Sequence, residues 1–288
     1  MNKRQEPRLR FQGFTGAWEE KKVIDFSPLQ RGFDLPVSKI NEGDYPVVFS
    51  NGILKSHNQY KVKGVGIVTG RSGTIGEVTF VEKDFWPHNT ALWVTIFFSN
   101  NPQFVFYFLK NFDLSRFATG SGVPTLNRND VHNQTIYVPK FEEQTAIGNF
   151  FRRLDSQIAE SRAVLEKSRQ LKKAMLAKMF PANGEKTPKI RFKGFEGEWE
   201  REILKGVVNV FDNLRIPVSE NKRTSGNTPY FGANGIQDYV DGFTHNGEFV
   251  LIAEDGANDL KNYPVQYVNG KCWVNNHAHV LQGQSEIL

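Results

Sequence analysis

The feature that most constrains the fold is a long heptad pattern between Phe141 and Phe180. From Ile147 onward, a 4-3-4-3 spacing places apolar residues at seven of ten positions, which is typical of a coiled-coil seam. No glycine or proline interrupts the stretch from Asn149 to Phe180, and Pro181 follows it. At about 1.5 Å per residue, roughly 36 residues form a rod of about 54 Å. Because a single rod cannot bury its own apolar stripe, the pattern predicts a helix that packs against a second helix.

The second constraint is an internal duplication. Residues 7–23 read PRLRFQGFTGAWEEKKV and residues 188–204 read PKIRFKGFEGEWEREIL, with eight of seventeen positions identical. The match continues further on, where Asn234-Gly235-Ile236 repeats Asn51-Gly52-Ile53. The separation grows from 181 to 187 residues along the chain, as small insertions in loops would produce. Each repeat is far longer than a solenoid repeat, so the chain contains two related domains.

The first repeat has the pattern of a mixed fold. Its β-branched runs predict short strands at 46–50, 64–69, 74–81, 91–98 and 136–138. The apolar stretch 102–114 follows a pair of asparagines and predicts a helix packed on the sheet. We therefore predict an α+β fold, with tandemly repeated mixed α/β domains joined by a long coiled-coil helix. The expected boundaries are a first domain at 1–140, the helix at 141–180 and a second domain at 181–288, which we expect to be truncated.

Composition narrows the class of protein. The net charge of +5 and the pI near 9.1 favour a polyanionic partner such as nucleic acid. The one cysteine, Cys272, excludes an internal disulfide and a cysteine-built zinc site, and it is typical of a reducing compartment. Residues 1–10 lack the apolar core of a signal peptide, and a polar break at 99–103 divides the longest apolar run. We therefore expect a soluble, cytoplasmic protein without a membrane segment.

Three predicted loops of the first repeat, at 55–59, 71–72 and 125–129, are dense in side chains that hydrogen-bond to base edges and phosphates. Glycines such as Gly70 and Gly120 lie beside two of these loops and allow the backbone to approach a phosphate closely. Polar loops are more often only solvated, but this density predicts a DNA-binding surface. The candidate DNA-binding residues are Lys55, Ser56, Asn58, Gln59, Arg71, Ser72, Ser121, Thr125, Asn127 and Arg128.

Motifs for catalysis and metal binding are weak. Asn227-Thr228-Pro229-Tyr230 resembles the Asn-Pro-Pro-Tyr motif of amino-methyltransferases, but its first proline is missing and no glycine loop for S-adenosylmethionine precedes it. A turn that starts a strand is the simpler interpretation. The glycines of residues 64–70 lie inside a strand pattern and do not fit a dinucleotide fingerprint. No acidic or cysteine pattern accompanies His277 and His279, so we predict no metal site and no catalytic residue.

Four segments of the sequence form a recognisable set. They are Arg10-Phe11-Gln12-Gly13-Phe14 with Trp18, its repeat Arg191-Phe192-Lys193-Gly194-Phe195 with Trp199, the loop GSGVPTLN at 120–127, and the helix start VPKFEEQTAI at 138–147. Together with the duplication and the long helix, this set resembles the specificity subunit of type I restriction-modification systems over essentially the whole chain. The four segments are scaffold motifs, so they do not indicate which DNA sequence is read.

The resemblance implies a non-catalytic subunit. Each repeat would be a target recognition domain that reads one half of a bipartite site in double-stranded DNA. A pair of long helices would separate the two domains and bind the methyltransferase (modification) subunits and a restriction/translocase subunit. No cofactor is expected on this chain, because S-adenosylmethionine and ATP belong to the partner subunits.

Two other interpretations stay open at the level of sequence. The chain could be a fragment of a fused DNA methyltransferase/nuclease, or a coiled-coil scaffold protein without DNA binding. The second repeat lacks a long helix of its own, so two chains could pair their helices as a homodimer. The residues that we expect in such a subunit interface are Ile147, Phe151, Leu154, Ile158, Leu165 and Met175.

Overall fold

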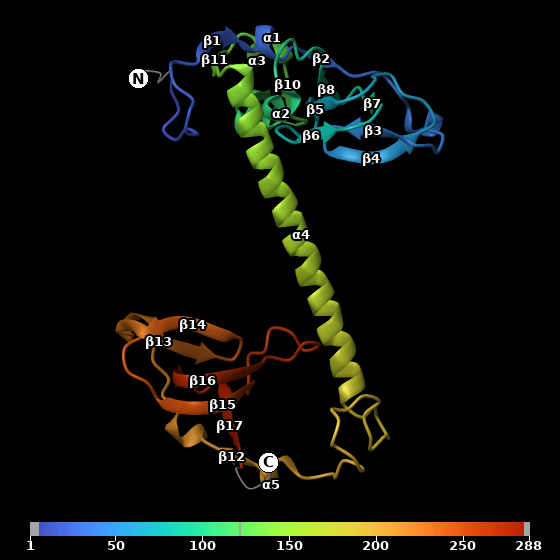
Figure 1. The fold of residues 1–288 in the computed structure, drawn as a ribbon. Coiled ribbons are helices and arrows are strands. Elements are labelled where there is room, and N and C mark those ends of the chain that lie inside the picture. Colours follow the sequence, from blue (N-terminus) through green and yellow to red (C-terminus); the bar gives the residue numbers. More distant parts are fainter. Residues whose placement is uncertain (1–5, 121, 285–288) are drawn as a thin grey trace. The chain divides into compact units, whose positions relative to one another are not determined.

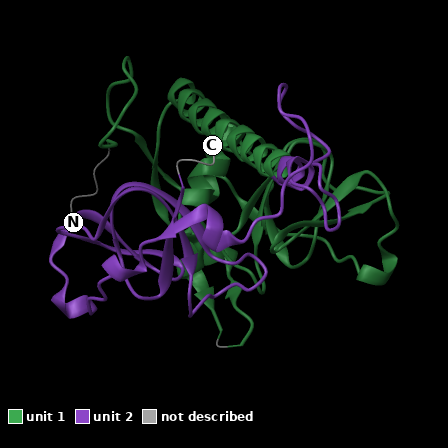
Figure 2. Ribbon diagram, turned by 90° about the horizontal axis from the view of Figure 1, so that it is seen from below, with its two compact units in different colours: residues 1–172 green, residues 173–288 purple. Residues whose placement is uncertain are grey.

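The chain divides into two compact units, residues 1–172 and residues 173–288 (Figure 2). The structure is a computed structural model that describes residues 6–120 and 122–284. The division falls inside the long helix α4 (Phe141–Met179), which is continuous over 39 residues (Figure 1). Both units contain sheets and helices, which confirms the predicted α+β class. Within the described ranges, none of the helices has the length and apolar character needed to cross a bilayer.

The first unit contains two sheets and two short strand pairs. The larger sheet has the order β2-β8-β5-β6, formed by Leu29–Arg31, Ala91–Val94, Gly66–Gly70 and Val78–Val81. The smaller sheet has the order β4-β3-β7, formed by Gly52–His57, Tyr45–Phe49 and Trp86–Pro87. The short pairs join β1 (Glu19–Lys22) to β11 (Thr135–Val138) and β9 (Ala118–Thr119) to β10 (Thr125–Leu126). The helices before α4 are α1 (Val23–Phe26), α2 (Pro102–Asn111) and α3 (Arg128–His132).

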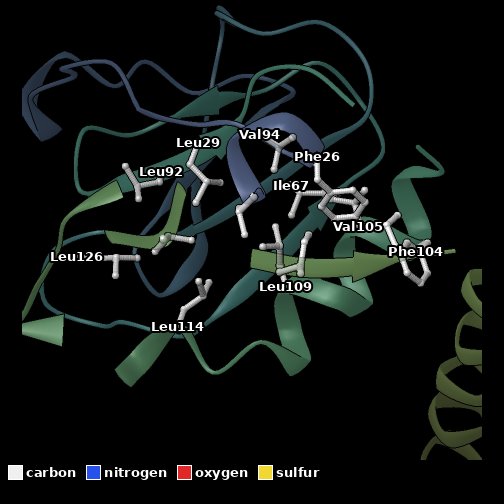
Figure 3. Packing of buried hydrophobic residues seen from close by; sticks show 14 residues of the cluster. Phe26, Leu29, Ile67, Leu92, Val94, Phe104, Val105, Leu109, Leu114 and Leu126 are labelled. Atoms are coloured by element: carbon white, nitrogen blue, oxygen red, sulfur yellow. The ribbon is translucent and has the colours of Figure 1, made fainter. Parts of the chain in front are cut away.

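The core of the first unit lies between the larger sheet and α2 (Figure 3). Strand β5 contributes Ile67 and helix α2 contributes Leu109, and both side chains are almost fully buried. Phe26 of α1 packs edge-to-face against Phe104 of α2, with 6.1 Å between the ring centroids. Helix α2 begins where the sequence predicts, because the Asn101 side chain accepts a hydrogen bond from the Phe104 N–H at 3.1 Å. Burial of each large apolar side chain contributes about 1.5–3 kcal/mol.

A buried ion pair fixes the beginning of α4 to the N-terminal segment. Glu143 is 2% exposed and accepts hydrogen bonds from Arg10 Nε at 2.8 Å and Arg10 Nη2 at 2.6 Å. The hydrogen bonds to Glu143 raise the pKa of Arg10, so the guanidinium stays charged. Arg10 Nη1 also donates to the Gly16 carbonyl at 2.6 Å, and Phe11 packs edge-to-face on Phe150 of α4. Two of the segments that carry the sequence resemblance, residues 10–14 and residues 138–147, are therefore in contact. We call this contact between the N-terminal segment and the beginning of α4 the joint.

Gln144 completes this joint from the next position of the helix. Its side-chain oxygen accepts from the Asn101 N–H at 2.9 Å. Its amide group donates to Asn100 Oδ1 and to the Pro139 carbonyl, both at 2.9 Å. Since Gln144 is 3% exposed, these bonds form where water cannot replace them. The residue connects the start of α2 with the start of α4.

The second unit contains a single six-stranded sheet. Its order is β12-β17-β15-β16-β13-β14, formed by Val208–Val210, Ala278–Gly283, His245–Ala253, Val265–Val274, Ser225–Gly232 and Gly235–Val240. A short helix, α5 (Leu204–Val207), precedes the sheet. The core is small and includes Phe231, Phe249 and Val274 with the buried Cys272. Burial raises the pKa of the Cys272 thiol to about 11.

Strand register confirms the internal duplication. In the first unit Val47 of β3 lies parallel to Trp86 of β7, and in the second unit Tyr230 of β13 lies parallel to Trp273 of β16. The hairpins β3–β4 and β13–β14 both turn at an Asn-Gly pair, where Gly52 and Gly235 have positive φ angles of 102° and 115°. A residue with a Cβ would be strained there, which explains why both repeats keep glycine.

The elements differ from the sequence expectations at several ends. Strand β6 starts at Val78 rather than at residue 74, since Gly76 turns the chain with a φ angle of 94°. Strand β8 ends at Val94 rather than at residue 98, and Phe98 has a positive φ angle of 48°. The sequence analysis did not predict β4 or α3. Strand β4 pairs with the adjacent strand β3 but is mostly exposed, and α3 has five residues, so hydrophobic periodicity indicates both elements poorly.

Replacing Gln144 by alanine tests the joint. We expect the free energy of unfolding of the first unit to fall by about 2–4 kcal/mol, because each buried group left without a partner costs about 1–3 kcal/mol. Urea denaturation followed by circular dichroism measures the change. Gln170→Ala is the matched control, since Gln170 is an exposed glutamine of the same helix that bonds to Glu166. Equal losses in the two variants would contradict a structural role for Gln144.

Candidate nucleic-acid interface

A polar hollow of about 710 Å³ lies in the first unit, at the ends of β2 and β5 and beside the β9–β10 pair. Four of the ten predicted DNA-binding residues line it, together with residues that the sequence analysis did not single out. The full lining is Gln30, Arg31, Gly32, Phe33, Asp34, Arg71, Leu92, Thr125, Leu126, Asn127 and Arg128. We call this site the first hollow.

Backbone hydrogen bonds bring the two predicted loops of the first hollow together. The Leu126 N–H donates to the Arg71 carbonyl at 2.8 Å, and the Gly73 N–H donates to the Pro124 carbonyl at 2.9 Å. Ser72 forms an isolated bridge with Thr125, which places this serine in the connection rather than in the lining. The loop after β5 and the strand β10 are thus a single surface. Because the two loops are far apart in the sequence, local sequence patterns do not indicate that they meet.

Asn127 and Arg128 occupy the beginning of α3. The Asn127 side chain accepts a hydrogen bond from the Asn129 N–H at 3.1 Å, so it caps the helix. Arg128 is the first residue of the helix, and its side chain is exposed. Asn127 therefore has a structural role that the sequence analysis missed, while Arg128 is an exposed residue of the lining.

Three polar residues form a network at the rim of the first hollow. Arg31 Nη2 donates to Asp34 Oδ1 at 2.8 Å, and Asn89 Nδ2 donates to the same oxygen. Both side chains of the ion pair are about half exposed or more, so the pair contributes little to stability. Arg31 and Asp34 both line the hollow, as does Arg71.

The other predicted DNA-binding residues lie elsewhere in the first unit. Lys55 and Ser56 belong to β4, so the prediction of a loop at 55–59 is wrong as far as His57. These two residues line a separate hollow of about 510 Å³ with Ile53 and Leu54, which are half exposed. Asn58 and Gln59 follow the strand and are exposed. Ser121 lies outside the described residues.

The predicted subunit-interface residues follow α4 away from the first core. Ile147 packs against that core, so it is already largely covered. Phe151 lies 5.3 Å from the Tyr107 ring and is 43% exposed. Leu154, Ile158 and Leu165 have 37%, 48% and 51% of their surface exposed, and Met175 is half-buried. The apolar seam is therefore open to solvent in its middle part.

The second unit has a charged cluster that the sequence analysis missed. Asp212 Oδ2 accepts from His279 Nδ1 at 2.6 Å, and Glu254 Oε2 accepts from Arg215 Nη1 at 2.5 Å. Burial alone would raise the pKa of Asp212, but hydrogen bonds from His279 and from the Val280 N–H, with the charge of Arg215, lower it. The prediction that His279 lacks acidic partners is wrong, because strand pairing brings them from distant positions. Arg215 already supplies a positive charge to both carboxylates, which argues against a metal ion.

The methyltransferase-like tetrapeptide is part of a strand. Tyr230, its last residue, lies in β13 and is 1% exposed. The Tyr230 hydroxyl donates to the Val218 carbonyl and accepts from the Val218 N–H. An aromatic ring that is buried and held in this way cannot stack on a flipped base. The simpler interpretation, a structural role at the strand, is supported.

Known proteins similar to this chain fit the duplicated architecture. The sequence matches the type I restriction modification DNA specificity domain over residues 16–167 and again over residues 196–288. A relative from Haemophilus influenzae, named as a type I restriction enzyme specificity subunit, is 54% identical over 95 residues, which make up 33% of this chain and 24% of the relative. That match thus spans about a quarter of the relative's length. The crystal structure of a type I restriction-modification system S subunit from M. genitalium shares the fold, with a TM-score of 0.68 at 18% identity, over 98% of this chain and 76% of that one.

Both repeats are matched by the same domain, and the two matches together cover most of the sequence. The chain therefore belongs to the type I restriction modification DNA specificity family. This confirms the resemblance that the scaffold motifs indicated.

A buried histidine at the end of α3 makes the stability of the first unit sensitive to acid. The Leu29 N–H donates to His132 Nε2 at 2.8 Å, so this nitrogen must be unprotonated. Burial lowers the pKa of His132, and the nearby charge of Arg128 lowers it further. The unfolded chain, with an ordinary histidine pKa near about 6.5, therefore takes up a proton first as the pH falls. The contribution of His132 to stability is present above that pH and is lost below it.

We expect the free energy of unfolding to decrease between pH 7 and pH 5, with His132 as one contributor. In the variant His132→Gln, whose side-chain oxygen can still accept from Leu29, the decrease should be smaller. Urea titrations at a series of pH values measure both slopes. An unchanged slope in the variant would show that His132 does not contribute.

Proposed function

We propose that this chain recognises a DNA sequence for a type I restriction-modification complex. The observation that carries the proposal is the match of both repeats to the DNA specificity domain. The first hollow agrees with it, since three of its lining residues are arginines and two more, Gln30 and Thr125, have side chains that hydrogen-bond to base edges. The net charge of +5 also favours a polyanion.

In this proposal each repeat reads one half of a bipartite site. Helix α4 would set the distance between the two halves and contact the methyltransferase subunits. The restriction/translocase subunit would join through that complex. S-adenosylmethionine and ATP would bind to the partner subunits, so the chain itself would select the site and perform no chemistry.

The first functional prediction concerns Arg128. Arg128→Gln should weaken binding of the full chain to all duplex DNA sequences alike and reduce the salt slope by about 1, as expected for the loss of one phosphate contact. Fluorescence anisotropy with labelled duplexes at several salt concentrations measures both quantities. Lys83→Gln is the control, because Lys83 is an exposed cation of the same unit that lines neither hollow.

If Lys83→Gln weakens binding as much as Arg128→Gln, the first hollow has no special role. If the wild-type chain, alone and with its modification subunits, binds no DNA, the scaffold interpretation replaces the proposed function.

We also propose that two chains pair through the exposed seam of α4. Leu154 and Ile158 are four residues apart, and Ile158 and Leu165 are seven residues apart, so the three side chains share one face of the helix. All three are large apolar side chains in contact with solvent. A symmetric pair of antiparallel helices would bury them and would present two identical first units. Such a dimer would favour an interrupted palindrome in DNA.

The double variant Leu154→Asp, Ile158→Asp should abolish this self-association, because it places charges in the seam. Light scattering coupled to gel filtration at tens of micromolar measures the mass of the wild type and the variant. Arg162→Asp serves as a control for the added charge, since it lies on the same helix outside the predicted seam. A monomeric wild type under these conditions would show that the seam is not a homodimer interface.

A further inference from the structure

The two repeats carry side chains of opposite charge at equivalent places on their surfaces. Three pairs of equivalent residues define this shared position, and the first pair follows from the pairing of β2 with β8 and of β12 with β17. Leu29 pairs with Val94 in the first unit, and Val210 pairs with Leu281 in the second. Two residues later in the sequence come Arg31, the last residue of β2, and Asp212, which follows the end of β12 and begins a turn of 3₁₀ helix.

The second pair of equivalent residues comes directly after the ends of strands β5 and β15. Gly70 pairs with Ala91, and Ala253 pairs with Ala278, so the two strands end at the same register. The next residues are Arg71 and Glu254. The Arg71 N–H donates to the Thr90 carbonyl at 2.9 Å, and the Glu254 N–H donates to the His277 carbonyl at 2.9 Å, so the backbone is held in the same way in both repeats.

The third pair of equivalent residues is Leu92 of the first unit, which lines the first hollow, and His279 of the second unit. Arginine, arginine and leucine in one repeat thus correspond to aspartate, glutamate and histidine in the other. The strand pairing beneath the second and third pairs agrees, since Ala91 and Ala278 are both buried alanines that pair with the last residues of β5 and β15. The framework is constant and the charge at the surface position is inverted.

The inverted charges match opposite hydrogen-bonding edges of DNA bases. Guanine presents two acceptors in the major groove, and an arginine guanidinium donates to both. Cytosine and adenine present amino donors there, from which a carboxylate accepts. Two side chains of opposite sign at one structural position therefore select different bases.

We propose that this position reads a base in each repeat, with Arg71 selecting guanine and Glu254 selecting a base that carries an amino group, cytosine or adenine. The proposal rests on the proposed function and adds residues and base classes to it. Arg71 is the reader in the first unit because Arg31 is already engaged with Asp34, and the Asn127 side chain caps α3. Glu254 is the reader in the second unit because its side chain is 41% exposed and its bond with Arg215 uses Oε2, whereas the side chain of Asp212 is 22% exposed and accepts bonds at both oxygens.

Selection from a randomised pool of duplex DNA tests the proposal. The full chain, assembled with the methyltransferase subunits of its own system, is used as wild type and as Arg71→Gln, Glu254→Gln and Lys83→Gln. We expect Arg71→Gln to lose preference for guanine at one position of the selected sequence, by about 5- to 150-fold. Glu254→Gln should relax a different position, at which the wild type selects cytosine or adenine. Lys83→Gln should leave the selected sequence unchanged.

Three results would contradict the base-reading proposal or the proposed function. If Arg71→Gln weakens binding equally for all sequences, Arg71 contacts a phosphate and the base-reading proposal is overturned. If both variants select the wild-type sequence with wild-type preference, the proposal also fails, while the proposed function stands. If the wild type enriches no sequence, the proposed function itself fails.

Thermal unfolding of each variant checks that the fold is intact. Glutamine at position 254 keeps an oxygen that can accept from Arg215, so the second unit should stay folded. The Arg71 variant decides the proposal by itself if the Glu254 variant unfolds.

Discussion

The structure depends first on the ion pair between Arg10 and Glu143. A carboxylate with 2% exposure is stable only when its charge is compensated and its oxygens are hydrogen-bonded, and the Arg10 guanidinium supplies both. Gln144 beside it bonds to the beginning of α2. The N-terminal segment, α2 and the first turns of α4 are therefore bonded to one another where α4 leaves the first core. The second repeat keeps one hydrogen bond of this arrangement, because Arg191 donates to the Gly197 carbonyl as Arg10 donates to the Gly16 carbonyl.

The exposure of the apolar side chains of helix α4 increases along its length. At Ile147 its apolar side chains belong to the core of the first unit, and by Leu154 and Ile158 similar side chains are exposed to solvent. Exposed apolar side chains at heptad spacing gain free energy only when another surface covers them. This gradient explains how one helix can serve both as part of a domain and as a surface for association.

The duplication separates the roles of framework and surface. Strand registers, the Asn-Gly hairpins and the buried alanines agree between the repeats. The residues at the ends of β5 and β15 differ in charge although the backbone hydrogen bonds beneath them agree. Under the proposed function, substitutions at these positions would change the DNA sequence that is read without altering the fold, because side chains at the protein surface contribute little to stability.

Four features could be read from the sequence alone: α4, the duplication, the cap of α2 and the α+β class. These features are local or repetitive: a heptad, an asparagine before a helix, a second copy of the same string. Only the tertiary structure decided which polar residues meet. It joined Arg71 to Thr125 and separated both from Lys55, it assigned Asn127 to a helix cap, and it brought Glu254 and His279 to Asp212. The physical reason is that strand pairing at long range sets these contacts, and the register of a strand depends on its partners rather than on its own residues.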